Sequence, residues 1–286
     1  MDKIRKIKMT LKSRPTFEGA GVRLKRAFGY VDDSLDPFLL LDDFHSDDPK
    51  DYIAGFPWHP HRGIETITYM LHGKVEHGDS LGNGGVIKAG DIQWMTAGSG
   101  IIHQEMPKKS ENSTLLWGFQ LWANLPASHK MMNPRYRDIK SEQVPEISLN
   151  ENKIKIKIIS GELNGVKGPV QDIITDPEYL DIKIEPNTVF IHPITEGYNV
   201  FAYIIDGEGY FDDVKQELVR KETLVIFQDG NIIQISTENE KVRFLLVSGK
   251  PLKEPVAWRG PIVMNTDEEL RIAFNEYQNG TFTKHK

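Results

Sequence analysis

The fold of this chain is decided by residues 59–73, which read HPHRGIETITYMLHG. From Ile64 onward, β-branched and aromatic residues alternate with polar ones, a pattern typical of a strand with one buried face. Gly73 closes the run, as glycine commonly does at a turn. His59 and His61 stand two residues apart at its start, so in an extended backbone their side chains point to the same side.

A weaker copy of this stretch occurs in the second half of the chain. Residues 200–207 read VFAYIIDG. Each copy is followed by a second strand pattern that leads to a glycine, KAGDIQWM at 88–95 and KETLVIF at 221–227. Two similar β-units in tandem indicate two β-barrels of one kind. The polar, aperiodic segment 134–152 is the expected linker between them.

Helical signals are scarce before the C-terminus. There Thr266 and Glu269 form a capping-box pattern, and apolar residues follow at helical spacing. We therefore predict an all-β chain of two tandem antiparallel β-barrel domains with a short C-terminal helix. The predicted domains are residues 1–138 and 139–286.

Composition narrows the class of protein. The chain has 286 residues, of which 39% are hydrophobic and 27% charged, and this is a globular balance. Cysteine is absent from the sequence, which excludes disulfides, thiolate metal sites and cysteine nucleophiles. A net charge of −6 argues against direct nucleic-acid binding. No apolar run spans a membrane and the N-terminus shows no secretory signal, so we expect a cytoplasmic protein.

A second pair of metal-binding side chains follows the first. His103 and Glu105 also stand two residues apart, so two strands in one barrel could bring three imidazoles and a carboxylate together. This donor set suits a divalent first-row metal: iron, manganese, nickel, copper, cobalt or zinc. An isolated pair of histidines is more often two half-exposed side chains on a strand, but the second pair favours a metal site.

The other histidines lack this spacing. The second half of the chain has only His192 near the first position and no histidine–acid pair after Gly230. We therefore expect metal chemistry in one barrel and a structural role for the other. The remaining histidines are predicted to be surface or satisfied polar residues: His45, His72, His77, His129 and His285.

Three segments resemble the pirin family. They are GFPWHPHRGIET at 55–66, GDIQWMTAGSGIIHQE at 90–105 and GPIVMNT at 260–266, and the resemblance covers nearly the whole chain. It implies a bicupin of two jelly-roll domains with a metal, generally iron, in the first domain only. The residues that match the family's ligands are His59, His61, His103 and Glu105.

Two nearby residues need separate interpretation. Glu65 lies where many other cupins place a carboxylate ligand, so we expect it to support the ligands rather than bind the metal. Trp58 departs from the family pattern, which usually has a small polar or acidic residue there. Its ring could narrow the entrance to the site.

The resemblance implies two functions. The first is a quercetin 2,3-dioxygenase-like oxidoreductase, in which a flavonol reacts with O2 to release carbon monoxide and a depside, and Glu105 takes the substrate hydroxyl proton. The alternative is a regulatory protein whose metal occupancy or redox state controls binding to a transcription factor or a metabolic enzyme. A storage protein with an incidental metal is the least favoured reading. The family implies a monomer.

Overall fold

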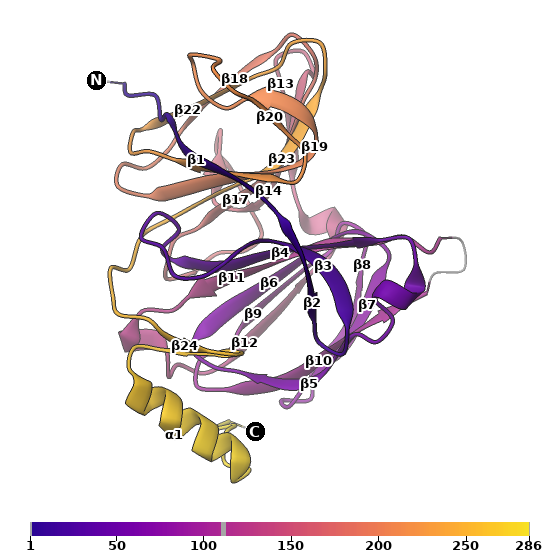
Figure 1. Cartoon of the computed structure of the whole chain (residues 1–286), viewed down its shortest axis with the longest axis vertical. Helices are drawn as coiled ribbons and strands as arrows, with labels where there is room; N and C mark the ends of the chain where they lie inside the picture. Colours follow the sequence, from indigo (N-terminus) through magenta and orange to yellow (C-terminus); the bar gives the residue numbers. More distant parts are fainter. Residues whose placement is uncertain (1, 110–112, 286) are drawn as a thin grey trace. The chain divides into compact units, whose positions relative to one another are not determined.

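The structure is a computed structural model that describes residues 2–109 and 113–285, and it consists mainly of β-strands (Figure 1). The chain forms two compact units, each assembled from several parts of the sequence. Unit 1 comprises Met1–Ser13, Asp32–Pro37 and Glu142–Pro251, and unit 2 comprises Arg14–Val31, Phe38–Ser141 and Leu252–Lys286.

The predicted division at residues 138 and 139 lies close to the junction between Ser141 and Glu142. A single boundary does not describe the two units. The N-terminal residues belong to the unit formed mainly by the second half of the sequence, and the C-terminal residues belong to the unit formed mainly by the first half. β1 (Ile7–Lys12) pairs with β21 (Thr223–Phe227) in unit 1. In unit 2, Ile262 of β25 (Ile262–Met264) forms a parallel bridge with Arg62.

Unit 2 contains two antiparallel sheets. The larger has the strand order β12-β9-β6-β11-β4-β3-β2, and the smaller has the order β5-β10-β7-β8. The larger sheet is built from β2 (Arg14–Glu18), β3 (Val22–Gly29), β4 (Phe38–Ser46), β6 (Ile64–His72), β9 (Ile92–Thr96), β11 (Leu116–Asn124) and β12 (Arg135–Ile139). The smaller sheet is built from β5 (Phe56–His61), β7 (Lys74–Asp79), β8 (Gly84–Lys88) and β10 (Ile101–Lys108).

The other elements of unit 2 are short. They are the hairpin of β24 (Ala257–Arg259) with β25, the 3-10 turns η1 (Pro49–Asp51) and η2 (Ala127–His129), and helix α1 (Asp267–Gln278). The predicted capping box is present in α1, because Thr266 Oγ1 accepts from the Glu269 amide and the Glu269 carboxylate accepts from the Thr266 amide.

Unit 1 is organised around one ten-stranded antiparallel sheet. Its main path is β1-β21-β19-β23-β17-β14-β13; in addition, β20 and β22 pair with β19, and β18 pairs with β22. The strands of this sheet not yet bounded are β13 (Glu146–Leu149), β14 (Ile154–Ser160), β17 (Glu178–Ile184), β18 (Val189–Pro193), β19 (Asn199–Tyr210), β20 (Leu218–Arg220), β22 (Ile232–Ser236) and β23 (Val242–Gly249). β15 (Glu162–Leu163) and β16 (Val166–Lys167) form a separate two-stranded sheet, and the 3-10 turn η3 (Ser141–Gln143) precedes β13.

The predicted fold class is confirmed: an all-β chain with two jelly-roll domains and one C-terminal helix. The sheets remain open in their hydrogen-bonded order rather than closing into complete barrels. The expected linker at 134–152 is largely structured, since it contains β12 and β13. Its polar sequence belongs to outer strands, where side chains meet solvent or polar neighbours.

Strand β6 is buried more completely than its alternating sequence predicts. Eight of its nine residues are buried, so both faces are covered. Thr66 and Thr68 lie on one face and Glu65 and Ile67 on the other, by the two-residue period of a strand. The face that carries Thr68 is the one directed to the candidate site, because Thr68 donates to Glu105 on the smaller sheet.

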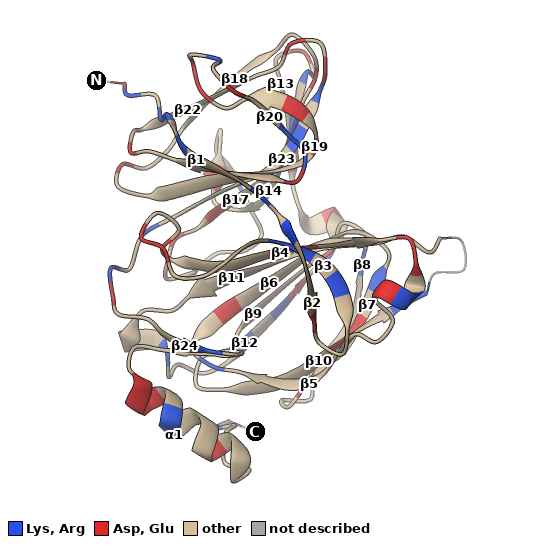
Figure 2. Ribbon diagram, in the orientation of Figure 1, with Lys and Arg blue, Asp and Glu red and all other residues tan. Residues whose placement is uncertain are grey.

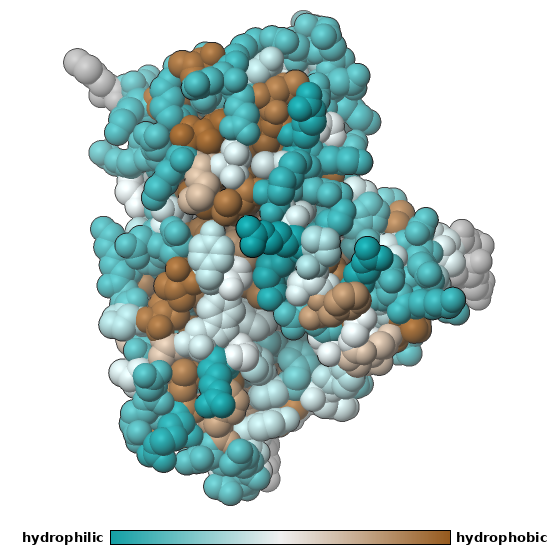
Figure 3. Space-filling view, in the orientation of Figure 1, coloured by the Kyte–Doolittle hydropathy of each residue, from teal (hydrophilic) through white to brown (hydrophobic). Residues whose placement is uncertain are grey.

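Charged residues of both signs are interspersed over the chain, whereas apolar surface is gathered in patches. Figure 2 shows Lys and Arg interspersed with Asp and Glu along both units, consistent with the net charge of −6. On the face shown in Figure 3, apolar residues form patches separated by hydrophilic ones. In the described part of the chain, no helix has the length and apolar character needed to cross a membrane.

A buried lysine fixes the C-terminal segment within unit 2. Lys130 is 1% exposed, and its Nζ donates to Gly63 O at 2.9 Å, Asn124 Oδ1 at 2.6 Å and Val263 O at 3.1 Å. The three protons of the ammonium thus each have an acceptor. This arrangement joins β25 to the turn between β5 and β6.

We predict that Lys130→Met destabilises unit 2 by about 3 kcal/mol or more, because three buried oxygens lose their donor. Urea unfolding followed by tryptophan fluorescence measures this change, since all five tryptophans lie in unit 2: Trp58, Trp94, Trp117, Trp122 and Trp258. The control is Lys88→Met, at an exposed lysine, which should alter stability by about 0.5 kcal/mol or less. Equal effects of the two substitutions would contradict the role given to Lys130.

Candidate metal centre

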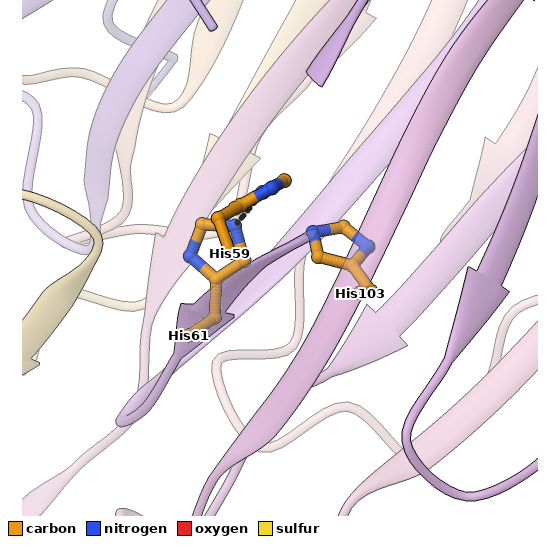
Figure 4. A group of neighbouring side chains, drawn as sticks. All are labelled: His59, His61 and His103. Atoms are coloured by element: carbon orange, nitrogen blue, oxygen red, sulfur yellow. Dashed lines mark hydrogen bonds between the residues drawn. The ribbon is translucent and has the colours of Figure 1, made fainter. Parts of the chain in front are cut away.

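Three of the predicted residues meet on the smaller sheet of unit 2. His59 and His61 lie on β5, and His103 lies on β10 directly opposite His59. One ligand nitrogen from each lies within 4.8 Å of the other two. Figure 4 shows the rings converging, with one ring nitrogen of His103 directed towards the other two imidazoles. In residues 2–109 and 113–285, this is the one group of His, Asp and Glu side chains close enough to hold a metal.

Backbone carbonyls fix the tautomers of two of these rings. The Nδ1 atom of His59 lies 2.8 Å from Pro57 O, and that of His61 lies 3.0 Å from Pro261 O. A carbonyl oxygen only accepts, so each Nδ1 carries a proton and donates it. In the neutral rings, both Nε2 atoms are therefore left with bare lone pairs.

The bare nitrogens fit a bound cation. Nε2 of His59 and Nε2 of His61 are 3.1 Å apart, too close for two unprotonated lone pairs without a charge or proton between them. Nε2 of His103 is buried and has no hydrogen-bond partner in the described structure. A divalent first-row metal would satisfy all three nitrogens, since imidazole is a common ligand for such ions.

Burial keeps the rings of His61 and His103 neutral. Desolvation lowers the pKa of His61 to about 3, with a further contribution from His59, against a small opposing effect of the Pro261 carbonyl. The pKa of His103 is also well below its usual value, mainly because of burial and then because of His61, His59 and His77. Both imidazoles are therefore in the unprotonated form that binds metal across the neutral pH range.

Glu105 lies on β10, two residues beyond His103, and is buried. Its Oε1 accepts from Thr68 Oγ1 and its Oε2 from Gln120 Nε2, each at 3.0 Å. The pairing of β10 with β5 is irregular between His103 and Glu105. The carboxylate is not in the group of ligand atoms within 4.8 Å of one another, so its role as fourth ligand stays a prediction.

Two neighbouring residues lie away from the histidines. Glu65 occupies the face of β6 opposite to Thr68, and its Oε1 accepts from Thr96 Oγ1 at 2.6 Å. It therefore does not support the ligands as expected from its position in the sequence. Trp58 is 52% exposed and is not part of the wall of the cavity beside His59.

An open cavity of about 610 Å³ borders two of the histidines. His59 and His61 form part of its wall, and the indole of Trp122 stands edge-on to His61 with ring centres 5.0 Å apart. Trp258, from the C-terminal segment, lies 6.0 Å from Trp122 between ring centres. The volume is in the range of small-molecule sites in proteins.

A charged group forms another wall of this cavity. Arg26 donates from Nε and Nη2 to the two carboxylate oxygens of Asp42, both at 2.8 Å, and its Nη2 lies 2.8 Å from Glu18. Burial raises the pKa of Asp42 to about 6, and Arg26 opposes that rise. With two carboxylates and one guanidinium, this wall disfavours strongly anionic ligands.

Several residues of the site carry no signal in the sequence. Gln120 and Trp122 stand two apart on β11 and reach the cavity together, but a strand of this composition is usually core. Pro261 and Trp258 come from the far end of the chain. His77, predicted to be a satisfied polar residue, is buried, and its ring is hydrogen-bonded to the Tyr136 hydroxyl.

The strand pair β18–β22 of unit 1 can be compared with β5–β10 of unit 2 through the register of each pair. β18 pairs with β22 so that Phe190 faces Ile235 and His192 faces Ile233. In unit 2, His59 faces His103 and His61 faces Ile101. By this register Phe190 and Ile235 stand in place of His59 and His103. His192 keeps the position of His61, but its Nε2 bonds Glu178 Oε2 at 2.8 Å.

We predict that the purified chain binds one divalent ion and that His61→Ala abolishes this binding, because it removes one of the three imidazoles whose ligand nitrogens converge. Metal analysis after reconstitution and desalting measures the occupancy. His192→Ala is the matched control, a buried histidine at the corresponding register of unit 1, and should retain the full metal content. Loss of metal in both variants, or in neither, would contradict the assignment.

The sequence matches the Pirin family over residues 21–123 and the Pirin C-terminal cupin domain over residues 179–283. Human Pirin is 40% identical over 284 residues, which cover 98% of this chain and 94% of that protein. A pirin-like protein of Caulobacter vibrioides is 40% identical over 281 residues, which cover 98% and 99%.

Solved structures agree with this result. A structure described as quercetin 2,3-dioxygenase from Acinetobacter baumannii superposes with a TM-score of 0.91 at 32% identity, covering 98% of this chain and 99% of that one. The two family matches lie in the two halves of the sequence and the relatives span nearly its full length. This chain is a member of the pirin family.

Proposed function

We propose that this protein is a metal-dependent dioxygenase that cleaves a flavonol such as quercetin with O2. The observation that carries the proposal is the open cavity of about 610 Å³ that borders His59 and His61 and has two tryptophans in its wall. The name of the Acinetobacter baumannii relative supports the same activity. A substrate in this cavity would lie beside the metal-binding nitrogens.

The proposed metal ligands are His59, His61, His103 and Glu105, and Fe(II) is the proposed ion. The Nδ1 hydrogen bonds of His59 and His61 leave their Nε2 atoms available for it, and the buried Nε2 of His103 has no hydrogen-bond partner in the described structure. A metal bound there would supply Lewis-acid and redox chemistry for the reaction between the flavonol and O2. The other candidate ions are manganese, nickel, copper, cobalt and zinc.

The cavity suits a planar aromatic substrate. Trp122 and Trp258 offer apolar ring surface, and their ring planes are tilted by 45°. The wall formed by Arg26, Asp42 and Glu18 leaves no unpaired positive charge for an anionic group. A polyphenol, which is uncharged or carries one ionised hydroxyl, fits both features better than a phosphate or polycarboxylate does.

Glu105 is the proposed general base. Each of its oxygens accepts one hydrogen bond, and a carboxylate has about four acceptor positions, so capacity remains for a substrate hydroxyl. Taking that proton would leave the flavonol as an anion, which is the form that reacts more readily with O2. Thr68 and Gln120 hold the carboxylate while it performs this step.

We predict that Glu105→Gln lowers quercetin turnover by about 100-fold or more, the usual contribution of a general base, and that its metal content falls less than in His61→Ala. Quercetin absorbance and oxygen uptake measure the rate, and metal analysis is done on the same samples. The control is Glu178→Gln in unit 1, whose carboxylate bonds His192, and it should retain wild-type turnover.

Full activity of Glu105→Gln would overturn the role of Glu105. Stoichiometric metal in the wild-type chain without turnover of quercetin, under any metal loading, would overturn the dioxygenase proposal. In that case, the regulatory alternative gains support, and a partner should then bind in a metal-dependent manner.

A further inference from the structure

A continuous chain of hydrogen bonds runs from the cavity wall to Glu105. The indole Nε1 of Trp122 donates to Gln120 Oε1 at 3.1 Å, and Gln120 Nε2 donates to Glu105 Oε2 at 3.0 Å. Trp122 and Gln120 both line the cavity. The side chain of Gln120 therefore connects a ring that a substrate would contact to the carboxylate beside the metal ligands.

The chemistry of the two partners allows only one orientation of the amide. An indole N–H only donates and an ionised carboxylate only accepts. Gln120 must therefore present its oxygen to Trp122 and its NH2 to Glu105. If the amide turned over, its oxygen would face the carboxylate and its NH2 would face the indole N–H, which are both repulsive contacts.

The other oxygen of Glu105 is held separately. Thr68 on β6 donates to Oε1, whereas Gln120 on β11 donates to Oε2. β6 and β11 are neighbours in the larger sheet, and Gln120 lies directly opposite Thr68 in their pairing. Two adjacent side chains of one sheet thus hold both oxygens of a carboxylate that belongs to the facing sheet.

We propose that Gln120 is a positioning residue for Glu105 and that Trp122 sets its amide orientation through the indole N–H. The inference rests on the proposed role of Glu105 as metal ligand and base. Gln120 touches neither the metal position nor the reacting atoms in this proposal. Gln120 holds Oε2 of Glu105 towards the larger sheet. This hydrogen bond restricts rotation of the carboxylate, so that Glu105 approaches the metal in a single orientation.

The test uses cobalt(II) as the metal, because its visible spectrum reports the ligand geometry without turnover. Gln120→Leu removes both hydrogen bonds while roughly preserving volume. We expect it to weaken cobalt affinity by about 10- to 100-fold, the usual effect of removing a group that orients a ligand, and to change the visible bands. Trp122→Phe keeps an aromatic ring at this position and leaves the Gln120 side chain in place but removes the indole N–H that holds the amide, so a smaller shift in the same direction is expected.

The matched control is Trp117→Phe on the same strand. Its indole Nε1 donates to Asp43 Oδ1 at 3.0 Å, and it is not part of the cavity wall. It should leave the cobalt affinity and spectrum as in the wild type, even if the chain loses some stability. Unfolding curves of all metal-free variants separate loss of folding from loss of affinity.

Glu105→Gln separates this inference from the proposed function. If Glu105→Gln alters the cobalt spectrum but Gln120→Leu does not, the positioning role is wrong and the proposed ligand set stands. If Glu105→Gln leaves the spectrum unchanged while His61→Ala removes binding, Glu105 is not a ligand, and the positioning role fails together with the proposed fourth ligand. Quercetin turnover of the wild-type chain still decides the dioxygenase proposal separately. Equal effects of Trp122→Phe and Trp117→Phe would overturn the part assigned to the indole N–H.

Discussion

The site depends on holding three imidazoles together, two of which, His61 and His103, are buried and kept unprotonated by that burial. The hydrogen bonds from Nδ1 of His59 and His61 to carbonyl oxygens fix both tautomers and leave two bare Nε2 atoms 3.1 Å apart. Without a cation this arrangement costs free energy, because buried lone pairs lack donors. The surrounding fold holds the rings in this arrangement, and the same arrangement favours metal binding.

Part of that restraint comes from the C-terminal segment. Pro261 supplies the carbonyl that sets the tautomer of His61, although the two residues are 200 positions apart. Two buried cations hold this segment in unit 2: Lys130 binds Val263 O, and Arg62 binds both Glu276 and the carbonyl of Phe282. The metal site is therefore completed only when the last part of the chain has packed, which links its formation to folding of the whole unit.

The sequence predicted the features that depend on local spacing. Strand periodicity placed His59 and His61 on one face and identified His103 as their partner, and the repeat gave the all-β class. Local spacing could not show that each end of the chain belongs to the unit built mainly from the other half, because β1 and its partner β21 are more than 200 residues apart in the sequence. The sequence also misplaced Glu65, since its position in other cupins does not reveal which face of β6 it occupies here. Nothing in the sequence distinguished Gln120 from other polar strand residues, because its role depends on hydrogen bonds to Glu105 and Trp122 that only the structure shows.

The two units show why a metal site of this kind is not needed for the fold. In unit 1, Phe190 and Ile235 stand at the positions of His59 and His103 and belong to one apolar cluster of buried residues. Their side chains pack without hydrogen-bond requirements, so this core is stabilised by burial alone. His192, the histidine at this register, is hydrogen-bonded through Nε2 to Glu178 Oε2. Unit 2 places imidazoles at the same register, where apolar side chains would need no partner, so the three histidines are accounted for by what they bind rather than by what the fold requires.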